Sequence, residues 1–268
     1  MRPPHYCSLF PIFLESIMKN KISGGNITIS RATGCLYTSN DCIYLVTNWH
    51  VLSGRHTQTK QTLDSKGGLP EIIRVHFPVD GNITEQITCE YKLTNDNKEY
   101  IWYEHPLSNE VDVAALKIQP PEGIATIPIN EIIDPAPTYR KDFFYVTQDV
   151  WVIGFPMGIR ISGLPIWKSA TIASEPSISS ASNKYKIILD TATREGMSGS
   201  PVLFVNKHLT RIKFDNVKHE VDLPSVKVML GIYSGRIAGD DELAAQLGIV
   251  WSCECIPELI KAKRIYNN

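Results

Sequence analysis

The sequence contains no long hydrophobic run. No apolar segment approaches the ~18 to 20 residues that a membrane-spanning helix needs, so we expect no membrane partner. The apolar stretch Cys7–Leu14 near the N-terminus is short, is interrupted by Pro11 and is followed by Glu15 without a small-residue cleavage site. It therefore predicts a poor secretory signal. The regular pattern begins just after Met18, and whether that residue is the true start stays open.

An excess of charge of either sign is also absent. The 268 residues include 27 Lys and Arg against 28 Asp and Glu, a formal net charge of −1, and the basic residues form no dense block. Because nucleic-acid binding depends largely on neutralising phosphates with clustered cations, we expect no nucleic-acid partner.

Cysteine is scarce, and its spacing fits neither of its common structural uses. Six residues in a chain this long do not form a disulfide framework, and no CxxC pair or neighbouring His pair indicates a metal site. We predict buried, reduced thiols and no metal site. Reduced thiols favour a reducing compartment such as the cytoplasm, although a periplasmic or secreted location stays open. The six cysteines are Cys7, Cys35, Cys42, Cys89, Cys253 and Cys255.

The sequence does contain many short apolar runs, separated by turns that include many of its 17 Gly and 17 Pro residues. This texture predicts an all-β fold in two units of about six strands each, and the pattern alone does not distinguish sandwiches from barrels. The predicted strands of the first unit are Ile27–Tyr37, Cys42–Trp49, Glu71–Val79, Ile83–Lys92, Tyr100–Tyr103 and Val111–Gln119. Those of the second are Val150–Phe155, Pro165–Ala173, Lys184–Thr191, Pro201–Val205, Lys227–Tyr233 and Gly248–Ser252.

Domain boundaries follow from this pattern. We predict an N-terminal extension over residues 1–26, the first β unit over 27–119, a proline-rich linker over 120–147, the second β unit over 148–253 and a C-terminal helix within 254–268. The helical pattern covers Pro257–Tyr266, and the polar segment Asn206–Pro224 is predicted to be an excursion between two strands.

Three segments carry residue types suited to nucleophilic catalysis. His50 follows a β-prone run and is expected at a strand end, and imidazole exchanges a proton near neutral pH. Asp112 falls on the apolar face of a predicted strand, where a carboxylate needs a specific donor such as a histidine N–H. Taken alone, His50 also fits a structural or solvent-facing histidine. Asp112 also fits an edge-strand carboxylate that reaches water.

The third segment places Ser198 between two glycines at a tight turn before an apolar strand. Gly196 permits backbone torsions closed to other residues, so its N–H and that of Ser198 can converge on one oxyanion. Alone, this segment also fits a structural Gly-rich turn. The order His, Asp, Ser along the chain is the order found in the chymotrypsin-like scaffold.

With these residues the chain resembles the trypsin-like (chymotrypsin-fold) serine peptidases, especially compact bacterial-type members without a PDZ domain. The resemblance runs from about Ile27 to Trp251. It implies two six-stranded antiparallel β-barrels with the active site between them. The segments that carry it are Thr47–Val51, Asp112–Ala114 and Gly196–Pro201, with secondary matches at Gly34, Gly154–Pro156 and Gly231–Gly235.

The resemblance implies a serine endopeptidase that hydrolyses peptide bonds through an acyl-enzyme intermediate and needs no metal or organic cofactor. The catalytic residues would be His50, Asp112 and Ser198, and the amides of Gly196 and Ser198 would form the oxyanion hole. A polypeptide substrate would dock along Tyr233, Ser234 and Gly235, beside a pocket walled by Ala192 and Thr193. Ala192 replaces the acid of trypsin-type pockets, so we expect a small or apolar residue before the cut; Arg236 leaves an acidic one open.

The chain also departs from the secreted animal members. Val51 follows the histidine where those members have a disulfide cysteine, and Met197 precedes the serine where they have an acid. Activation by cleavage of a zymogen is therefore not expected. The alternatives are a catalytically silent module on the protease scaffold and a peptidase completed by an activating partner protein, with a non-proteolytic esterase a more distant third.

Overall fold

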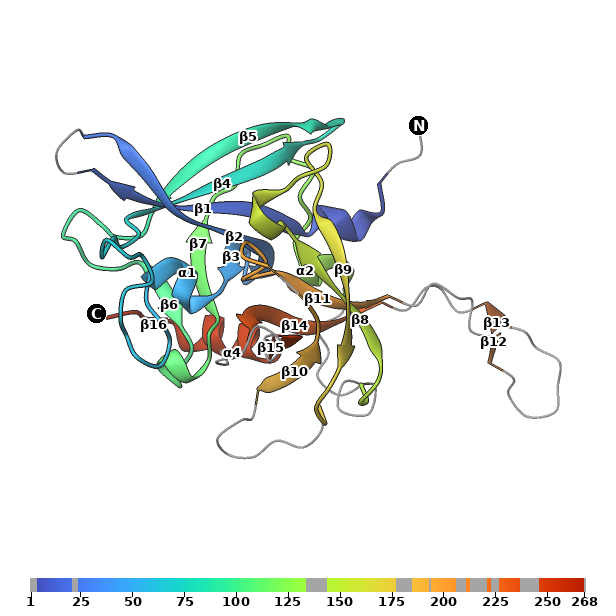
Figure 1. Cartoon of the computed structure of the whole chain (residues 1–268). Helices are drawn as coiled ribbons and strands as arrows, with labels where there is room; N and C mark the ends of the chain where they lie inside the picture. Colours follow the sequence, from blue (N-terminus) through green and yellow to red (C-terminus); the bar gives the residue numbers. More distant parts are fainter. Residues whose placement is uncertain are drawn as a thin grey trace.

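The computed structural model describes residues 4–20, 24–133, 144–176, 185–192, 194–205, 211–212, 221–222, 227–236 and 246–267. Strands dominate these ranges and form two large antiparallel sheets that pack against each other, a separate two-stranded ladder, and three short α-helices (Figure 1). The predicted all-β class is confirmed.

The first sheet has eight strands in the order β16-β6-β7-β3-β2-β1-β4-β5. Their bounds are β1 (Pro11–Lys19), β2 (Asn26–Ser39), β3 (Cys42–Thr47), β4 (Ile72–Val79), β5 (Asn82–Lys92), β6 (Trp102–Glu104), β7 (Ala114–Ile118) and β16 (Arg264–Ile265). The sheet does not close into the barrel that the sequence resemblance implied, so that part of the prediction is wrong. A single bridge, Thr94 with Tyr100, links the chain that leaves β5 to the chain that enters β6, and β16 takes the edge of β6.

The second sheet is a closed barrel of six strands, in the order β10-β15-β14-β11-β8-β9. Its strands are β8 (Asp149–Gly154), β9 (Ile166–Ile172), β10 (Lys186–Asp190), β11 (Pro201–Val205), β14 (Lys227–Arg236) and β15 (Leu247–Ser252). A separate two-stranded ladder joins β12 (Arg211–Ile212) to β13 (Val221–Asp222), both within the predicted polar excursion; the rest of that excursion lies outside the described residues. The six-stranded barrel predicted for this half is confirmed.

The strand β1 was not predicted. It lies in the range assigned to an N-terminal extension, yet it pairs with both β2 and β4 inside the first sheet. Ile12, Leu14 and Ile17 of this strand are fully buried. Pro11 is compatible with a strand because it stands at its first residue, where a missing N–H costs little.

The α-helices are α1 (Trp49–Ser53), α2 (Ile129–Ile132) and α4 (Cys255–Ala262), and single 3₁₀ turns cover Tyr6–Leu9, Ser108–Glu110 and Pro156–Gly158. The predicted C-terminal helix begins two residues earlier than expected and ends four residues earlier. Lys263 adopts a left-handed conformation that stops it, and the chain then pairs with β6 as β16. Of these described helices, none is long and apolar enough to cross a membrane.

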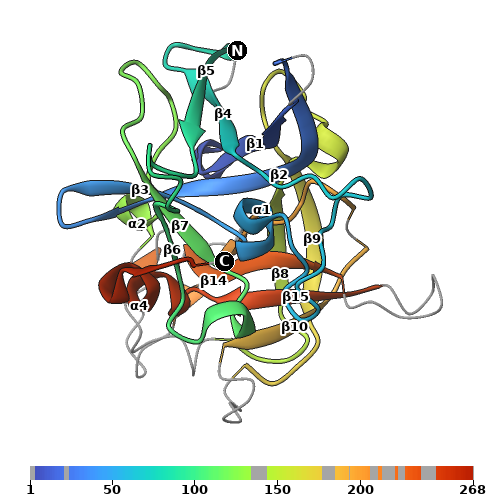
Figure 2. The same cartoon turned by 90° about the vertical axis from the view of Figure 1, so that its left-hand side faces the viewer.

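A shared hydrophobic core fixes the two sheets against each other. It joins Val46 and Ala115 of the first sheet to Leu203 and Ile232 of the barrel, and Leu259 of α4 packs into the same cluster. Seen from another side, the two sheets lie one above the other with α1 near their boundary (Figure 2). Burial of residues from both sheets in one core holds the cleft between them in a defined geometry.

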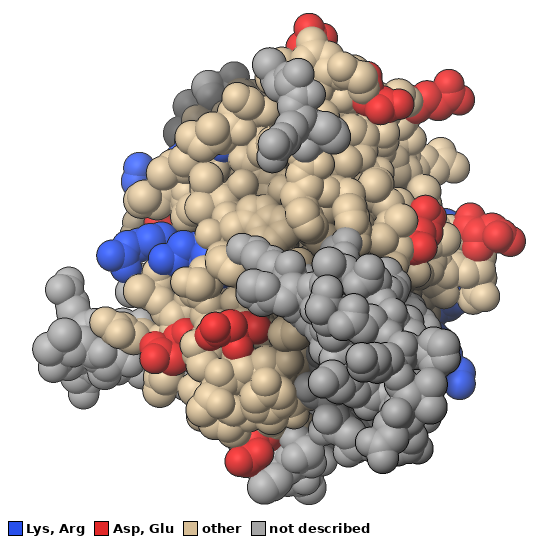
Figure 3. All heavy atoms as spheres, turned by 90° about the vertical axis from the view of Figure 1, so that its right-hand side faces the viewer, with Lys and Arg blue, Asp and Glu red and all other residues tan. Residues whose placement is uncertain are grey.

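Charged side chains of both signs are scattered over the described part of the face shown in Figure 3, and neither sign covers it continuously. This distribution agrees with the formal net charge of −1.

Candidate active site

His50 lies in the first turn of α1, a five-residue helix that begins two residues after β3 ends. The sequence predicted a strand end here, and the helix is a correction. Asn48 precedes the helix with an extended backbone, and its side-chain amide donates to the carbonyl of Asp112 at 2.7 Å. The neighbouring Trp49 is buried and its indole N–H donates to Glu104 at 3.0 Å, so the two residues before His50 are anchored.

Asp112 is buried, at 2% exposure, and its carboxylate accepts hydrogen bonds from three donors. Its Oδ1 accepts the backbone N–H of His50 at 2.9 Å, and its Oδ2 lies 2.6 Å from Nδ1 of the same residue. The hydroxyl of Ser234 also donates to Oδ2. Asp112 precedes β7 instead of lying in it, so the predicted strand alternation was wrong, but the expected compensation by a histidine N–H and a backbone amide is present.

The contact with Asp112 sets the protonation behaviour of His50. Burial of the ring lowers the pKa of His50, whereas the negative charge and hydrogen bond of Asp112 raise it. The second effect is larger, and the pKa of His50 is raised above its ordinary value. With Nδ1 bound to the carboxylate, Nε2 is the ring nitrogen available to exchange a proton.

Ser198 stands in the turn that leads into β11, and the turn is fixed by the first sheet as well as by the barrel. The Ser198 carbonyl accepts the N–H of Thr33 at 2.8 Å, and the N–H of Gly199 donates to Tyr233 at 2.8 Å. Gly199 has a φ of +85°, and a Cβ there would lie 1.9 Å from the Thr33 carbonyl oxygen. Only glycine fits this close approach.

Gly196 begins the same turn with a φ of +88°. The carbonyl of Glu195 accepts the N–H of Met157 at 2.6 Å, which fixes the peptide plane between Glu195 and Gly196. Within the described ranges, the N–H groups of Gly196 and Ser198 donate to no protein acceptor. No residue that the structure describes therefore occupies either amide.

No pattern in the sequence singled out Thr33. It is fully buried in β2, and its hydroxyl donates to the Gly196 carbonyl at 2.8 Å and accepts the N–H of Phe155 at 3.2 Å. Its own carbonyl accepts the hydroxyl of Thr47 at 2.7 Å. Thr33 thus ties the Gly196–Ser198 turn to β2 and to the end of β8, and only the packing of the two sheets reveals it.

The predicted docking segment occupies the end of β14. Tyr233 is buried, and beyond it the ladder between β11 and β14 ends while β15 continues to pair with Gly235. The strand bulges at Ser234, whose hydroxyl faces Asp112. Ala192 is exposed, and Thr193 lies outside the described residues.

His50, Gly196 and Ser198 line one cleft of about 560 Å³. The remaining wall comes from the edge of β2 between Thr28 and Arg31, from the loop that follows α1, and from Met157 and Glu195. Asp112 lies behind His50 and does not line the cleft. The structure therefore brings His50 and Asp112 into contact and places Ser198 and Gly196 on the same cleft as His50.

None of the cysteines contributes to this cleft, and all six lie in the described ranges without forming a disulfide. Four are buried, and Cys42 and Cys89 are partly exposed. Burial raises the pKa of the Cys35 thiol to about 12. Among the residues that the structure describes, no cluster of three or more His, Cys, Asp or Glu could hold a metal ion.

A closed six-stranded barrel packed on a second antiparallel sheet, with a His–Asp pair and a Gly-flanked serine between them, defines the chymotrypsin-like class of architecture. Comparison with protein families agrees, because the trypsin-like peptidase domain matches residues 32–209, about two thirds of the chain. The chain belongs to this trypsin-like family of serine proteases. No individual curated protein matches it significantly.

Proposed function

We propose that the protein is a serine endopeptidase with Ser198 as nucleophile, His50 as general base and Asp112 as the group that orients His50. The observation that carries this proposal is the 2.6 Å contact between Nδ1 of His50 and Oδ2 of Asp112, with Ser198 on the same cleft. A buried carboxylate on Nδ1 selects the tautomer in which Nε2 can accept a proton.

The chemistry follows from these groups. As the Ser198 hydroxyl attacks a peptide carbonyl, its proton passes to Nε2 of His50, and the imidazolium formed is stabilised by Asp112. His50 then protonates the departing amine, which leaves an acyl-enzyme. Water attacks this ester with the same base and regenerates the serine. The raised pKa of His50 favours the transient imidazolium.

Stabilisation of the oxyanion would come from the amides of Gly196 and Ser198. Neither donates to an acceptor in the described protein, and the bond from Met157 to the Glu195 carbonyl fixes the first of the two peptide planes. A single donor of this kind contributes about 10² to 10³ in rate. The acyl half of the substrate would pair with the edge of β14 at Ser234 and Gly235, where the ladder with β11 has ended. Ala192 would border the pocket for the residue before the cut, which we propose is small or apolar.

A fluorophosphonate probe tests the proposal directly, because it reacts only with an activated serine. We expect covalent labelling of Ser198 in the wild type, loss of labelling in Ser198→Ala and strong reduction in His50→Ala. Ser200→Ala is the matched control: it removes a buried serine of the same turn and should leave labelling intact.

Cleavage profiling on a peptide library, with Ser198→Ala as background, then supplies the sequence preference. Folded wild-type protein that neither reacts with the probe nor cleaves any peptide would contradict the enzyme and favour a silent module. Labelling that appears only after a second protein is added would favour the partner-activated alternative.

A further inference from the structure

The cleft beside Ser198 lies on the leaving-group side of the site. Its walls include His50, Ser198 and the β2 edge from Thr28 to Arg31, but no residue of β14. If the acyl half of a peptide lies along β14, as the proposed function requires, the chain after the scissile bond has to cross Ser198 into this cleft. The inference below rests on that placement.

The edge of β2 that faces the cleft can receive an extended chain. β1 pairs with β2 from Asn26 to Cys35, whereas β3 pairs with β2 only from Cys35 onward. In the described part of the sheet, the residues of β2 before Cys35 therefore have a strand neighbour on one side. Thr33, bonded to the Ser198 carbonyl at 2.8 Å, marks where this edge meets the nucleophile.

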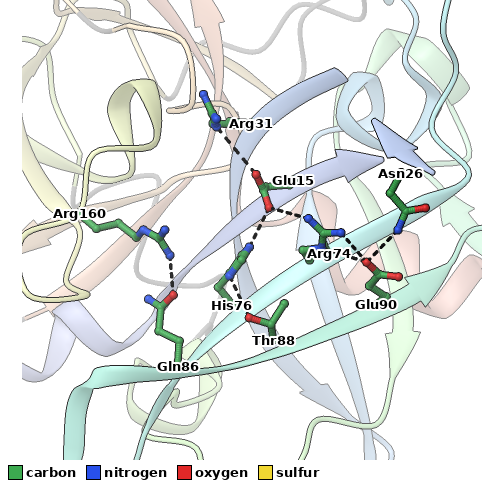
Figure 4. Close-up of polar contacts among 9 residues, drawn as sticks. All are labelled: Glu15, Asn26, Arg31, Arg74, His76, Gln86, Thr88, Glu90 and Arg160. Carbon is green, nitrogen blue, oxygen red and sulfur yellow. Dashed lines mark hydrogen bonds and ion pairs between the residues drawn. The ribbon is translucent and has the colours of Figure 1, made fainter. Parts of the chain in front are cut away.

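Arg31 is the cation on this edge. It stands two residues from Thr33, and about 7 Å of strand separates them. Its side chain is 56% exposed, and within the described part of the protein its one ion pair joins Nε to Oε1 of Glu15 at 3.9 Å (Figure 4). Its guanidinium donates no hydrogen bond to any residue that the structure describes. A Cβ at Gly158 would lie 2.9 Å from Cδ of Arg31, so the turn containing Gly158 packs against the stem of this side chain.

Glu15 already has closer partners than Arg31. Figure 4 shows a row of alternating charge across four strands, from Arg31 through Glu15 and Arg74 to Glu90. Arg74 lies 3.3 Å and the His76 ring 3.1 Å from Oε2 of Glu15.

Burial by itself raises the pKa of Glu15, but the contacts of His76 and Arg74 outweigh it and lower that pKa. The Glu15 carboxylate therefore remains charged and holds the Arg31 side chain at the edge of the cleft, but it leaves N–H donors of the Arg31 guanidinium open.

Two acids also line the cleft, and their positions limit the prediction. Oδ2 of Asp64 accepts the backbone N–H groups of Lys66 at 3.0 Å and Gly68 at 2.9 Å. A Cβ at Gly68 would contact both Asp64 and Met18, so these two side chains lie at the same place. Met18 pairs with Ile27 near the start of β2, and Asp64 therefore borders the end of β2 farthest from Ser198. Glu195 also borders the cleft; it belongs to the Ser198 turn, and its carbonyl accepts the N–H of Met157.

We propose that Arg31 selects substrates with Asp or Glu among the first two residues after the cleaved bond. A carboxylate in that position reaches the donors that Glu15 leaves open, whereas an acid farther along approaches Asp64 and gains nothing.

The test uses peptides with identical acyl halves that carry Glu, Gln or Lys at the first or second residue after the bond. We expect kcat/KM for Glu to exceed that for Gln by about two- to fivefold, the range of a partly exposed ion pair. Arg31→Gln should bring the ratio to one, and Arg31→Lys should keep most of it. Arg74→Gln is the matched control, because it breaks the same charge row away from the cleft, and it should preserve the ratio.

Equal rates for Glu and Gln in the wild type, or a ratio unchanged in Arg31→Gln, would overturn this proposal while Ser198-dependent cleavage still supported the proposed function. If no peptide is cleaved, the proposed function fails separately. Titration of the Ser198→Ala protein with the same peptides then decides the role of Arg31. Tighter binding of the Glu peptide, lost in the double variant with Arg31→Gln, supports it, and equal binding overturns it.

Discussion

Replacing Thr33 by Val should damage the site without touching any of the residues proposed to react. The two side chains have nearly the same shape, but Val lacks the hydroxyl that donates to Gly196 at 2.8 Å and accepts from Phe155 at 3.2 Å. Thr33 is fully buried, so water does not replace these bonds. Each of the two buried groups left without a partner costs about 1 to 3 kcal/mol, which gives a loss of about 2 to 6 kcal/mol in the free energy of unfolding.

The same substitution should lower turnover, because the Gly196 carbonyl loses the bond that holds its turn against β2. A misplaced oxyanion amide costs up to about 10² to 10³ in kcat, and partial displacement should cost at least about tenfold. KM should change less than kcat, since the docking edge of β14 is not involved. Urea denaturation measures the stability, and steady-state kinetics on the best library peptide measures the turnover.

Thr33→Ser is the control for this prediction. It keeps the hydroxyl and removes one buried methyl group, which costs about 1 kcal/mol. A Thr33→Val protein as stable and as active as Thr33→Ser would refute the reasoning, because the hydroxyl would then contribute nothing to the turn.

Two further predictions concern Asp112 and the aromatic residues packed around Trp49. Asp112→Asn removes the charge that raises the pKa of His50, so the rise of activity with pH should move to lower pH. On the plateau, kcat should fall by about 10⁴-fold, as in the template enzyme of this architecture. An unchanged inflection in the pH–rate profile would contradict this prediction. Tyr266→Ala removes a ring that stacks on Trp102 at 4.4 Å and meets Trp49 edge-on at 5.6 Å, so unfolding should become easier by about 3 to 5 kcal/mol. Ile265→Ala, at a side chain that is 54% exposed, should stay within about 0.5 kcal/mol of wild type in the same denaturation experiment.

Local pattern was sufficient for the strand-rich class and for most strand positions. Short apolar runs bounded by turn residues predicted the six strands of the barrel, because alternation and turn chemistry act over a few residues. The same local signals failed for β1. Its nine residues include Pro11 and a mostly apolar stretch, which resembled a weak targeting segment, and burial against both β2 and β4 is a long-range contact.

The local sequence pattern likewise could not predict that the first sheet stays open. Whether the ladder closes depends on which strand takes the edge of β6, and that strand is β16, more than 150 residues later in the chain. The helical pattern at Pro257–Tyr266 did not reveal that Arg264 and Ile265 would leave the helix to pair there. Cross-strand register between distant segments has no signature in either segment alone.

For the candidate site, residue type and order along the chain singled out His50, Asp112 and Ser198, because the chemistry of proton exchange and nucleophilic attack restricts which side chains can serve. Tertiary structure alone decided the rest. It set the 2.6 Å contact between His50 and Asp112, turned the Ser234 hydroxyl onto that carboxylate, and made Thr33 the link between the sheets and the Gly196 turn. These are contacts between residues more than 60 positions apart, and they exist only because packing of the two sheets brings buried polar groups within hydrogen-bonding distance.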